Sequence, residues 1–522
     1  MEEKKIVYYS EFGAVGDGVH EDFEAIKKCH EYANENGCTV YADKGAKYYI
    51  GETGGAAAVV KTDVNWQDAT FIIDDSIIPV ESPSRTANVF VIAHDYPMKK
   101  FDKDSDIVKA LNAAGGIKAQ EIKNIGYAPG YPALLVVHDE EHSAYLRWGC
   151  HATGKPNPQH EIAIIDENGN IDIDTPFLLD FLGVTSIEEY RIDDKTITAQ
   201  GGTFIHIANC APPVYTSYAR AIEVNRSNTV IRNVVHKIVD EGPHGAPCGG
   251  FIRWIHTTNL LCENVTLQSH ASYMDYQYDE RGEVKKVHSV MGSYDIGGGF
   301  SSHIHMKGCI QSDFYKWEEK RIVYNELERW GIMGSNYCKN FFYEDCTLSR
   351  LDAHAGVYNV KIKNSKITYI KLIGGGTALI ENTEIYAPEG TNAALIELRG
   401  DYGSTWRGDI IIKDCEFINW KDNAAYIASA LWNNWPFGYT TYLPRITIDN
   451  LKLDKKTPIY IFKINVEKGA LGYDKPVLES GEENKNPMRI DTTVTVKNNN
   501  DAYEYYSSNN DYLNEKMTLI CE

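Results

Sequence analysis

The segments Val360-Lys-Ile-Lys-Asn-Ser-Lys-Ile367 and Ala378-Leu-Ile-Glu-Asn-Thr-Glu-Ile385 begin 18 residues apart and share one pattern. Apolar and charged residues alternate up to a small polar residue at the fifth place. Alternation with a period of two predicts a strand that is buried on one face. Asparagine at a fixed place predicts a turn, because its short side chain tolerates a left-handed backbone.

Eight such segments align without gaps between residues 229 and 453. Their fifth places hold Asn233, Asn264, Gly308, Asp345, Asn364, Asn382, Asp414 and Asn450. These residues advance along the chain in steps of 18 to 44 residues, so a coil of 18–19 residues is the smallest repeat and longer coils carry loops. Stacked coils of this kind predict a solenoid. The residue before each turn is charged, which favours a solvated monomer face over a trimeric spike, and the cysteines after several turns are interpreted as small core residues.

The N-terminal segment resembles a known family. Phe12-Gly-Ala-Val-Gly-Asp-Gly-Val precedes apolar residues at helical spacing from Phe23 to Ala33; Gly37 then ends the predicted helix and Thr39-Val-Tyr resumes strand character. This order is similar to the opening of the pectate-lyase-like superfamily, which includes polygalacturonase-type glycoside hydrolases, polysaccharide lyases and phage tailspikes. The resemblance implies an all-β fold, a single right-handed parallel β-helix with an N-terminal capping helix.

The repeat is interrupted before residue 200. Glu161-Ile-Ala-Ile-Ile-Asp-Glu-Asn-Gly-Asn-Ile-Asp predicts a β-hairpin with its turn at Asn168-Gly169. The segment between Tyr145 and His160 is either the wall or lid of a groove or a surface excursion. We therefore expect an N-terminal cap over 1–50, first coils over 51–117, a hairpin-bearing insertion over 118–200, the main β-helix over 201–460 and a C-terminal cap over 461–522, with a strand at Thr492-Thr-Val-Thr-Val-Lys.

Composition narrows the function. The net charge of −21 argues against nucleic acid as a partner, and the chain has no apolar run long enough to span a membrane. The 34 tyrosines and 9 tryptophans suit a poly- or oligosaccharide, because aromatic faces pack on sugar rings. The polar start lacks a signal peptide, which leaves a cytoplasmic location or removal of a leader both open. Oligomeric state stays open as well.

One stripe of the predicted solenoid gathers titratable residues. Asp240 and Asp352 each stand seven places after their turn, and Arg350, Asp352 and His354 alternate so that they project to one side. Glycoside hydrolysis needs two carboxyl groups, so we expect the catalytic residues among Asp352, His354, Asp240, Glu241, Asp295 and Asp275. The resemblance places Asp240-Glu241 where polygalacturonases have paired aspartates, although the Asn-Thr-Asp, Gly-His-Gly and Arg-Ile-Lys signatures of that group are absent here.

Other residues are expected to bind substrate. They are His270, Arg350, His303, His305, Arg399, Glu397 and Trp406. His303 and His305 share one face, and such a pair can bind a metal. No third carboxylate adjoins them, so we expect neither a metal nor another cofactor.

The sequence therefore predicts a glycoside hydrolase that uses a carboxylate acid/base pair. Two alternatives stay open: a polysaccharide lyase that acts on a uronic-acid glycan, and a non-catalytic glycan-binding or tailspike-like protein.

Overall fold

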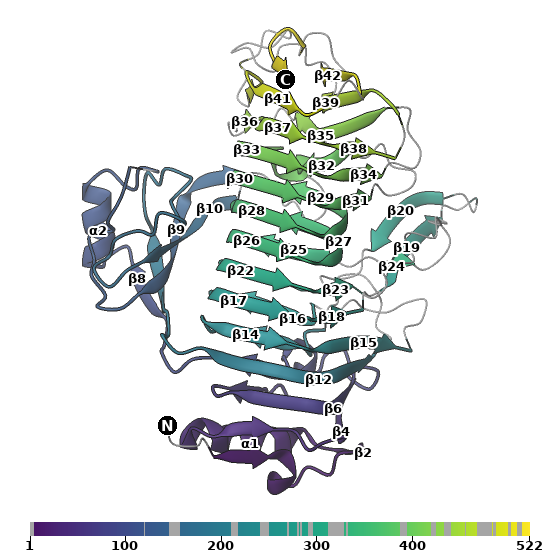
Figure 1. Ribbon diagram of the computed structural model, residues 1–522. Helices are drawn as coiled ribbons and strands as arrows, with labels where there is room; N and C mark the ends of the chain where they lie inside the picture. The colour runs from purple at the N-terminus through teal and green to yellow at the C-terminus, as the bar shows by residue number, and fades with distance from the viewer. Residues whose placement is uncertain are drawn as a thin grey trace.

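The computed structural model describes residues 5–119, 121–145, 157–209, 218–240, 250–268, 271–278, 281, 284–290, 296–311, 328–329, 332–386, 394–418, 424–432, 440–454, 456–466, 483, 487–499, 503–508 and 514–522. Parallel strands stack as successive rungs of one long spindle, with the N-terminus at one end and the C-terminal residues at the other (Figure 1).

Each rung contributes to three faces, on which every strand pairs in parallel with its counterparts in the neighbouring rungs. The first face contains β1 (Ile6–Tyr8), β3 (Thr39–Tyr41), the start of β6 (Val64–Asp74), the start of β12 (Ile197–Ile207), β14 (Thr229–Arg232), β17 (Thr258–Glu263), β22 (Ser302–Lys307), β26 (Lys339–Glu344), β28 (Val357–Lys363), β30 (Gly374–Glu381), β33 (Trp406–Lys413), β37 (Arg445–Asp449), β41 (Thr493–Lys497) and β43 (Thr518–Cys521).

The second face follows the turn residues. It contains β2 (Asp17–Glu21), β4 (Lys47–Ile50), the ends of β6 and β12, β15 (Val235–Val239), β18 (Thr266–Leu267), β23 (Ile310–Gln311), the start of β27 (Thr347–Ala353), the start of β29 (Lys366–Leu372), β31 (Glu384–Tyr386), β34 (Glu416–Ile418) and β38 (Lys452–Leu453).

The third face completes each rung. It contains β5 (Ala58–Val60), β7 (Phe90–Ile92), β13 (Ile222–Val224), β16 (Ile252–Ile255), β21 (Ile296–Gly299), β25 (Ile332–Asn336), the ends of β27 and β29, β32 (Ala394–Leu398), β35 (Ala425–Trp432), β39 (Ile459–Val466) and β42 (Tyr505–Ser508). Smaller elements are the 3-10 helices η1 (Tyr9–Phe12), η2 (Pro83–Thr86) and η4 (Gly400–Tyr402), the short pair β36 (Thr441–Tyr442) with β40 (Met488–Arg489), and a side sheet of β19 (Ala271–Tyr278), β20 (Val284–Val290) and β24 (Glu328–Arg329).

The turn between the first two faces is built as the sequence predicts. Asn364 and Asn382 have φ angles of 50° and 47°, in the left-handed region. The Asn364 amide donates to Asp345 at 3.1 Å, and the Asn382 amide donates to Asn364 at 2.9 Å. Asparagine thus tolerates the backbone and also links one rung to the next.

The core lies inside the spindle. The apolar residues two places before each turn, Cys262 among them, are buried, and so are Cys309, Cys346 and Cys415 just after it. The Cys309 and Cys346 thiols donate to the backbone carbonyls of Cys262 and Met306 at 3.3 and 3.4 Å. These cysteines are therefore core residues, as the sequence indicates.

The two ends of the spindle differ. α1 (Phe23–Asn36) buries Phe23, Ile26, Cys29, His30 and Ala33 against the first rungs, and Gly37 ends it with a φ of 66°. The expected C-terminal cap is wrong in its boundary, because β41 and β43 continue the first face up to Cys521. Among the described residues no helix has the length and apolar character that a membrane crossing requires.

The insertion forms a second sheet beside the spindle (Figure 1). Its strands lie in the order β10 (Asn157–Ile165), β9 (Ala133–Tyr145), β11 (Ser186–Arg191) and β8 (Lys99–Asp102), with α2 (Asp106–Ala113) packed nearby. The insertion thus begins at β8, earlier than the expected residue 118. The predicted turn forms, with Gly169 at a φ of 80°, but only one bridge, Ile165 to Ile171, follows it, since β10 pairs instead with β9.

Candidate functional site

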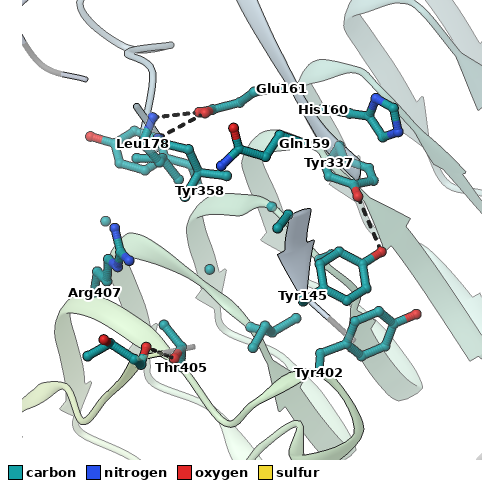
Figure 2. A pocket seen from close by; sticks show the side chains of 18 residues that line it. Tyr145, Gln159, His160, Glu161, Leu178, Tyr337, Tyr358, Tyr402, Thr405 and Arg407 are labelled. Carbon is teal, nitrogen blue, oxygen red and sulfur yellow. Dashed lines mark hydrogen bonds between the residues drawn. The ribbon is translucent and has the colours of Figure 1, made fainter. Parts of the chain in front are cut away.

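A cavity of about 430 Å³ opens where the insertion packs on the spindle. The insertion contributes Tyr145, Gln159, His160 and Glu161, while the spindle contributes Tyr337, Tyr358, Tyr402 and Arg407 among others (Figure 2). This volume lies within the range of small-ligand sites, and a wall made from two packed units is a common place for one.

A buried ion pair joins the two units beside this cavity. Lys339 of β26 is fully buried, and its ammonium group lies 2.7 Å from the Glu161 carboxylate. Burial lowers the pKa of Lys339, and the charge of Glu161 opposes that shift. Glu161 also accepts from the backbone N–H groups of Leu178 and Leu179 at 2.7 and 3.1 Å. Glu161 is thus fully engaged in holding the insertion in place.

Tyrosines form one wall of the cavity. Tyr145 lies between Tyr337 and Tyr402 in Figure 2: the Tyr337 hydroxyl donates to that of Tyr145 at 3.2 Å, and the Tyr145 and Tyr402 rings are 5.0 Å apart. Tyr337 stacks on Phe300 of the preceding rung at 4.8 Å. Both residues have positive φ angles, 52° and 50°, which is unusual for bulky side chains and typical of functional sites.

Behind Tyr402 lies a buried charge network. Asp352 of β27 is 2% exposed; the Arg350 guanidinium contacts it at 2.6 Å, and Arg399 contacts its other oxygen. Arg399 also holds Asp401 through two hydrogen bonds of 2.9 and 2.7 Å. Burial alone raises the pKa of Asp352, but Arg350, His354 and Arg399 outweigh it and hold that pKa well below its usual range. Asp352 is therefore a carboxylate.

This network orients His354. Its Nε2 lies 3.3 Å from the Asp352 carboxylate, and its Nδ1 lies 3.4 Å from the Tyr402 hydroxyl. An ionised carboxylate only accepts hydrogen bonds, so Nε2 carries the proton and Nδ1 accepts from Tyr402. The Arg399 guanidinium lies 5.0 Å from the centre of the Tyr402 ring, where it favours a phenolate. Tyr402, His354 and Asp352 thus form a chain that can withdraw a proton from the cavity wall.

The opposite side of the cavity carries a positive charge. Arg407 of β33 lines the cavity and is solvent-exposed, with its guanidinium 4.4 Å from the centre of the Tyr442 ring. A planar guanidinium matches a carboxylate group in two parallel hydrogen bonds. The cavity therefore combines aromatic faces, a proton-accepting chain and an arginine.

The structure places four predicted residues together: Arg350, Asp352, His354 and Arg399. The expected shared column of Asp240 and Asp352 is wrong. Asp240 follows β15 on the second face and is exposed, whereas Asp352 pairs with Gly334 and Lys371 on the third face. Equal counting from the turn fails, because the chain leaves the second face three residues earlier in the β27 rung than in the β15 rung.

Other predicted residues lie elsewhere. Glu397 forms an ion pair with Lys371 at 3.0 Å on the third face, near the network but outside the cavity lining. Trp406, expected to stack on sugar, is fully buried in the core, with its indole N–H on the Asp409 carbonyl at 3.2 Å. His303 and His305 lie on the first face and line a separate hollow of about 460 Å³, where His305 stacks on Phe342 at 4.4 Å and contacts Glu344 at 3.2 Å.

Three predicted residues, Glu241, His270 and Asp295, lie outside the described residues, and for Asp275 in β19 only the backbone is described. Sequence reasoning missed Tyr337, Tyr402 and Arg407. The high tyrosine count was the one available signal, since nothing in the sequence pairs residue 145 with residue 402. The segment for which a wall or lid and a surface excursion were both open has its two ends, Tyr145 and His160, on the cavity wall.

No family model matches the chain, and no curated protein matches it either. Several solved structures have a similar fold. The tailspike gp61 of Pseudomonas phage phi297 has a TM-score of 0.47 at 10% identity, over 94% of this chain and 78% of that one. The surface adhesin PfbA of Streptococcus pneumoniae has a TM-score of 0.38 at 12% identity, over 99% and 91%. A family 28 exopolygalacturonase of Yersinia enterocolitica has a TM-score of 0.35 at 12% identity, over 89% and 78%.

The assignment of the fold rests on the strand pairing itself. From β1 to β43 the strands of each face pair in parallel with the next rung, and the turns between the first two faces repeat the same left-handed residue. These features agree with the sequence motifs at the N-terminus. The fold is a single right-handed parallel β-helix.

Proposed function

We propose that the protein is a carbohydrate-active enzyme that binds a glycan in the cavity beside the insertion and cleaves it by β-elimination at a uronic-acid residue. The observation that carries this proposal is the chain from Tyr402 through His354 to Asp352, which ends on the cavity wall. Such a chain makes a tyrosine a proton acceptor.

Each part of the reaction has a residue that suits it. Arg407 pairs with the uronate carboxylate and so favours loss of the proton at the neighbouring carbon. Tyr402 takes that proton as its own proton passes to His354, the electron pair forms a carbon–carbon double bond, and the glycosidic C–O bond at the next carbon breaks. The leaving oxygen takes a proton from a tyrosine hydroxyl. Tyr145 suits this last step, because it lines the cavity and accepts from the Tyr337 hydroxyl, which can replace the proton that Tyr145 gives up.

Hydrolysis by a carboxylate pair is the second candidate. Among the described residues that line the cavity, Glu161 is the only carboxylate, and Lys339 and two backbone N–H groups engage it. Asp352 is ionised, so it has no proton to donate to a leaving group. The observation that favours hydrolysis is the exposed carboxylate of Asp240 at the end of β15, next to Glu241 in the chain.

A glycan panel distinguishes the two reactions. Elimination produces new reducing ends together with the ultraviolet absorbance of an unsaturated uronate. Reducing ends without that absorbance would show hydrolysis and overturn the elimination proposal, and the absence of both products on every uronate-containing and neutral glycan would leave a binding protein.

The Tyr402→Phe variant tests the residue that carries the proposal. It keeps the aromatic ring but removes the hydroxyl, so we expect kcat to fall about 10²–10⁴-fold with little change in KM. Tyr358→Phe is the matched control, because Tyr358 lines the same cavity without contacting His354, and its kcat should stay near that of the unaltered protein. Equal activity of the two variants contradicts the role of Tyr402.

A further inference from the structure

A cluster of metal-ligating side chains lies in the insertion, against the cavity. His138 of β9 stands directly opposite His160 of β10, and their Nδ1 atoms are 2.8 Å apart. Glu140 follows two residues after His138 on the same face of β9. One ligand atom from each of the three residues lies within 4.8 Å of the other two.

The two imidazole rings face each other across the β9–β10 pair. Two nitrogens at 2.8 Å share one proton, because one must accept from the other. Each neutral ring has one nitrogen lone pair. If the ring that donates the shared proton changes tautomer, both Nδ1 lone pairs become available and a metal ion can take the place of that proton.

A carboxylate of the neighbouring strand lies on the Nε2 side of His138. The Glu188 carboxylate of β11 lies 3.9 Å from His138 Nε2, a buried atom without a hydrogen bond within normal range. Tyr190 fixes Glu188 through a hydrogen bond of 2.7 Å. A proton on Nε2 facing Glu188 leaves Nδ1 of His138 as the ligand, and a carboxylate behind a ligating histidine is the common second layer of a metal site.

We propose that His138, Glu140 and His160 bind a divalent transition-metal ion of the zinc type. Two imidazole nitrogens and one carboxylate favour zinc, cobalt or nickel over calcium, which prefers six to eight oxygens. Two nitrogens on a tetrahedral zinc stand roughly 3.3 Å apart, given bonds of about 2.0–2.1 Å. The 2.8 Å pair thus needs to open by only about half an ångström, and exposed Glu140 gives the ion an entry path.

The site meets the cavity at His160. This residue lines the cavity beside Tyr337 (Figure 2), and its ring packs on Tyr337 at 5.9 Å and on Phe300 at 6.2 Å. These contacts fix the ring that bridges the insertion and the spindle. The three side chains leave a fourth coordination position open to water or a ligand oxygen.

Metal titration tests the proposal without measuring activity, so its outcome is independent of the proposed reaction. Protein freed of metal with EDTA and dialysed is titrated with zinc chloride by calorimetry, and with cobalt chloride by visible absorption. We expect one zinc per chain and a cobalt spectrum of low coordination number.

Three variants locate the ion. His138→Gln and Glu140→Gln should weaken zinc binding more than about 10–100-fold, the loss that outer-layer changes alone produce. Glu140 is exposed, so its variant should fold whatever the fate of the variant at half-buried His138. His305→Gln is the control, because His305 and Glu344 form another histidine–carboxylate pair. No stoichiometric binding, or binding lost only in His305→Gln, overturns the proposal.

Discussion

At the scale of single residues, a buried histidine predicts how stability depends on pH. His30 of α1 is fully buried, and its Nε2 lies 2.9 Å from the Tyr9 hydroxyl. Burial lowers the pKa of His30 from 6.5 to about 3. The unfolded chain therefore binds a proton that the folded chain refuses between pH 6.5 and 3, so stability falls as pH falls through that window. His30 alone should cost about 2 kcal/mol between pH 7 and 5.

Urea unfolding at pH 7, 6 and 5 measures this effect. The His30→Gln variant removes the titrating ring, so its free energy of unfolding should fall less steeply with acid by the same amount. His256, whose pKa burial lowers to about 4, keeps its own share of the slope in both proteins. Parallel pH curves for variant and parent would contradict the assignment.

The structural role of a single residue was predictable from the sequence where its local backbone alone determines that role. Asparagines at the turns took the predicted backbone, because a left-handed turn needs a short polar side chain whatever surrounds it. The prediction that Trp406 binds sugar was wrong. A tryptophan can pack in a core or on a sugar ring, and only the tertiary packing decides between the two. The alternation of Arg350, Asp352 and His354 is visible in the sequence, but Tyr402, which contacts His354, lies in a later rung that no local pattern connects to them.

At the scale of elements, the turn ladder predicts the effect of a substitution. Asn364 sits at a φ of 50° between Asp345 and Asn382, with hydrogen bonds to both. Alanine there loses both bonds and strains the backbone, whereas glycine loses the bonds without strain, as Gly308 does naturally at a φ of 61°. We expect Asn364→Ala to be less stable than Asn364→Gly by about 1–2 kcal/mol.

Urea unfolding of the two variants, compared with the parent, measures that difference. Lys366→Ala, two residues further on, serves as a surface control and should change stability little, because its side chain is only half-buried and its 3.1 Å ion pair with Glu384 is open to solvent. Equal loss in the alanine and glycine variants would show that hydrogen bonds, and not backbone strain, set the cost.

Element prediction succeeded where the repeat was long and failed where it was short. The segments after residue 229 alternate over eight residues and gave their strands directly. A second asparagine column, at Asn228, Asn259, Asn340 and Asn359, escaped notice, although each has a positive φ and His303 takes its place in one rung. The aligned segments began just after that column. The expected hairpin failed because its first strand found a longer partner in β9, and register in a sheet follows the larger buried face.

At the scale of the whole molecule, one ion pair holds the insertion to the spindle. Glu161→Gln leaves the fully buried Lys339 without its counter-charge. Breaking such a pair typically costs about 3–5 kcal/mol. We expect the free energy of unfolding to fall by that amount and the affinity for a glycan to fall with it, because the cavity wall moves. Calorimetric melting and glycan titration check the two effects.

The variant Glu167→Gln is the matched control for that experiment. Glu167 lies in the same insertion but is exposed beside the turn at Asn168, so its loss should change neither measurement. Loss of stability in both variants would mean that acidic charge in general, and not the contact with Lys339, stabilises the junction.

The overall architecture was predictable because each rung repeats the same short sequence pattern of alternating residues and a turn. The cavity was not, because it depends on how two separately folded surfaces meet. The insertion began at β8 and not at 118 for the same reason: β8 pairs with β11, 84 residues later, and a pairing of that length leaves no periodic signal.

The residues of the cavity wall are synthesised at very different times. Tyr145 leaves the ribosome long before Thr440, and both line the same cavity. At about 5–20 residues per second, roughly 300 residues of synthesis separate them by about 15–60 seconds. During that interval Tyr145 and His160 of the insertion are exposed to solvent, because the later spindle rungs that complete the cavity have not yet been synthesised. These side chains become buried in the cavity wall only when the last of those rungs has folded.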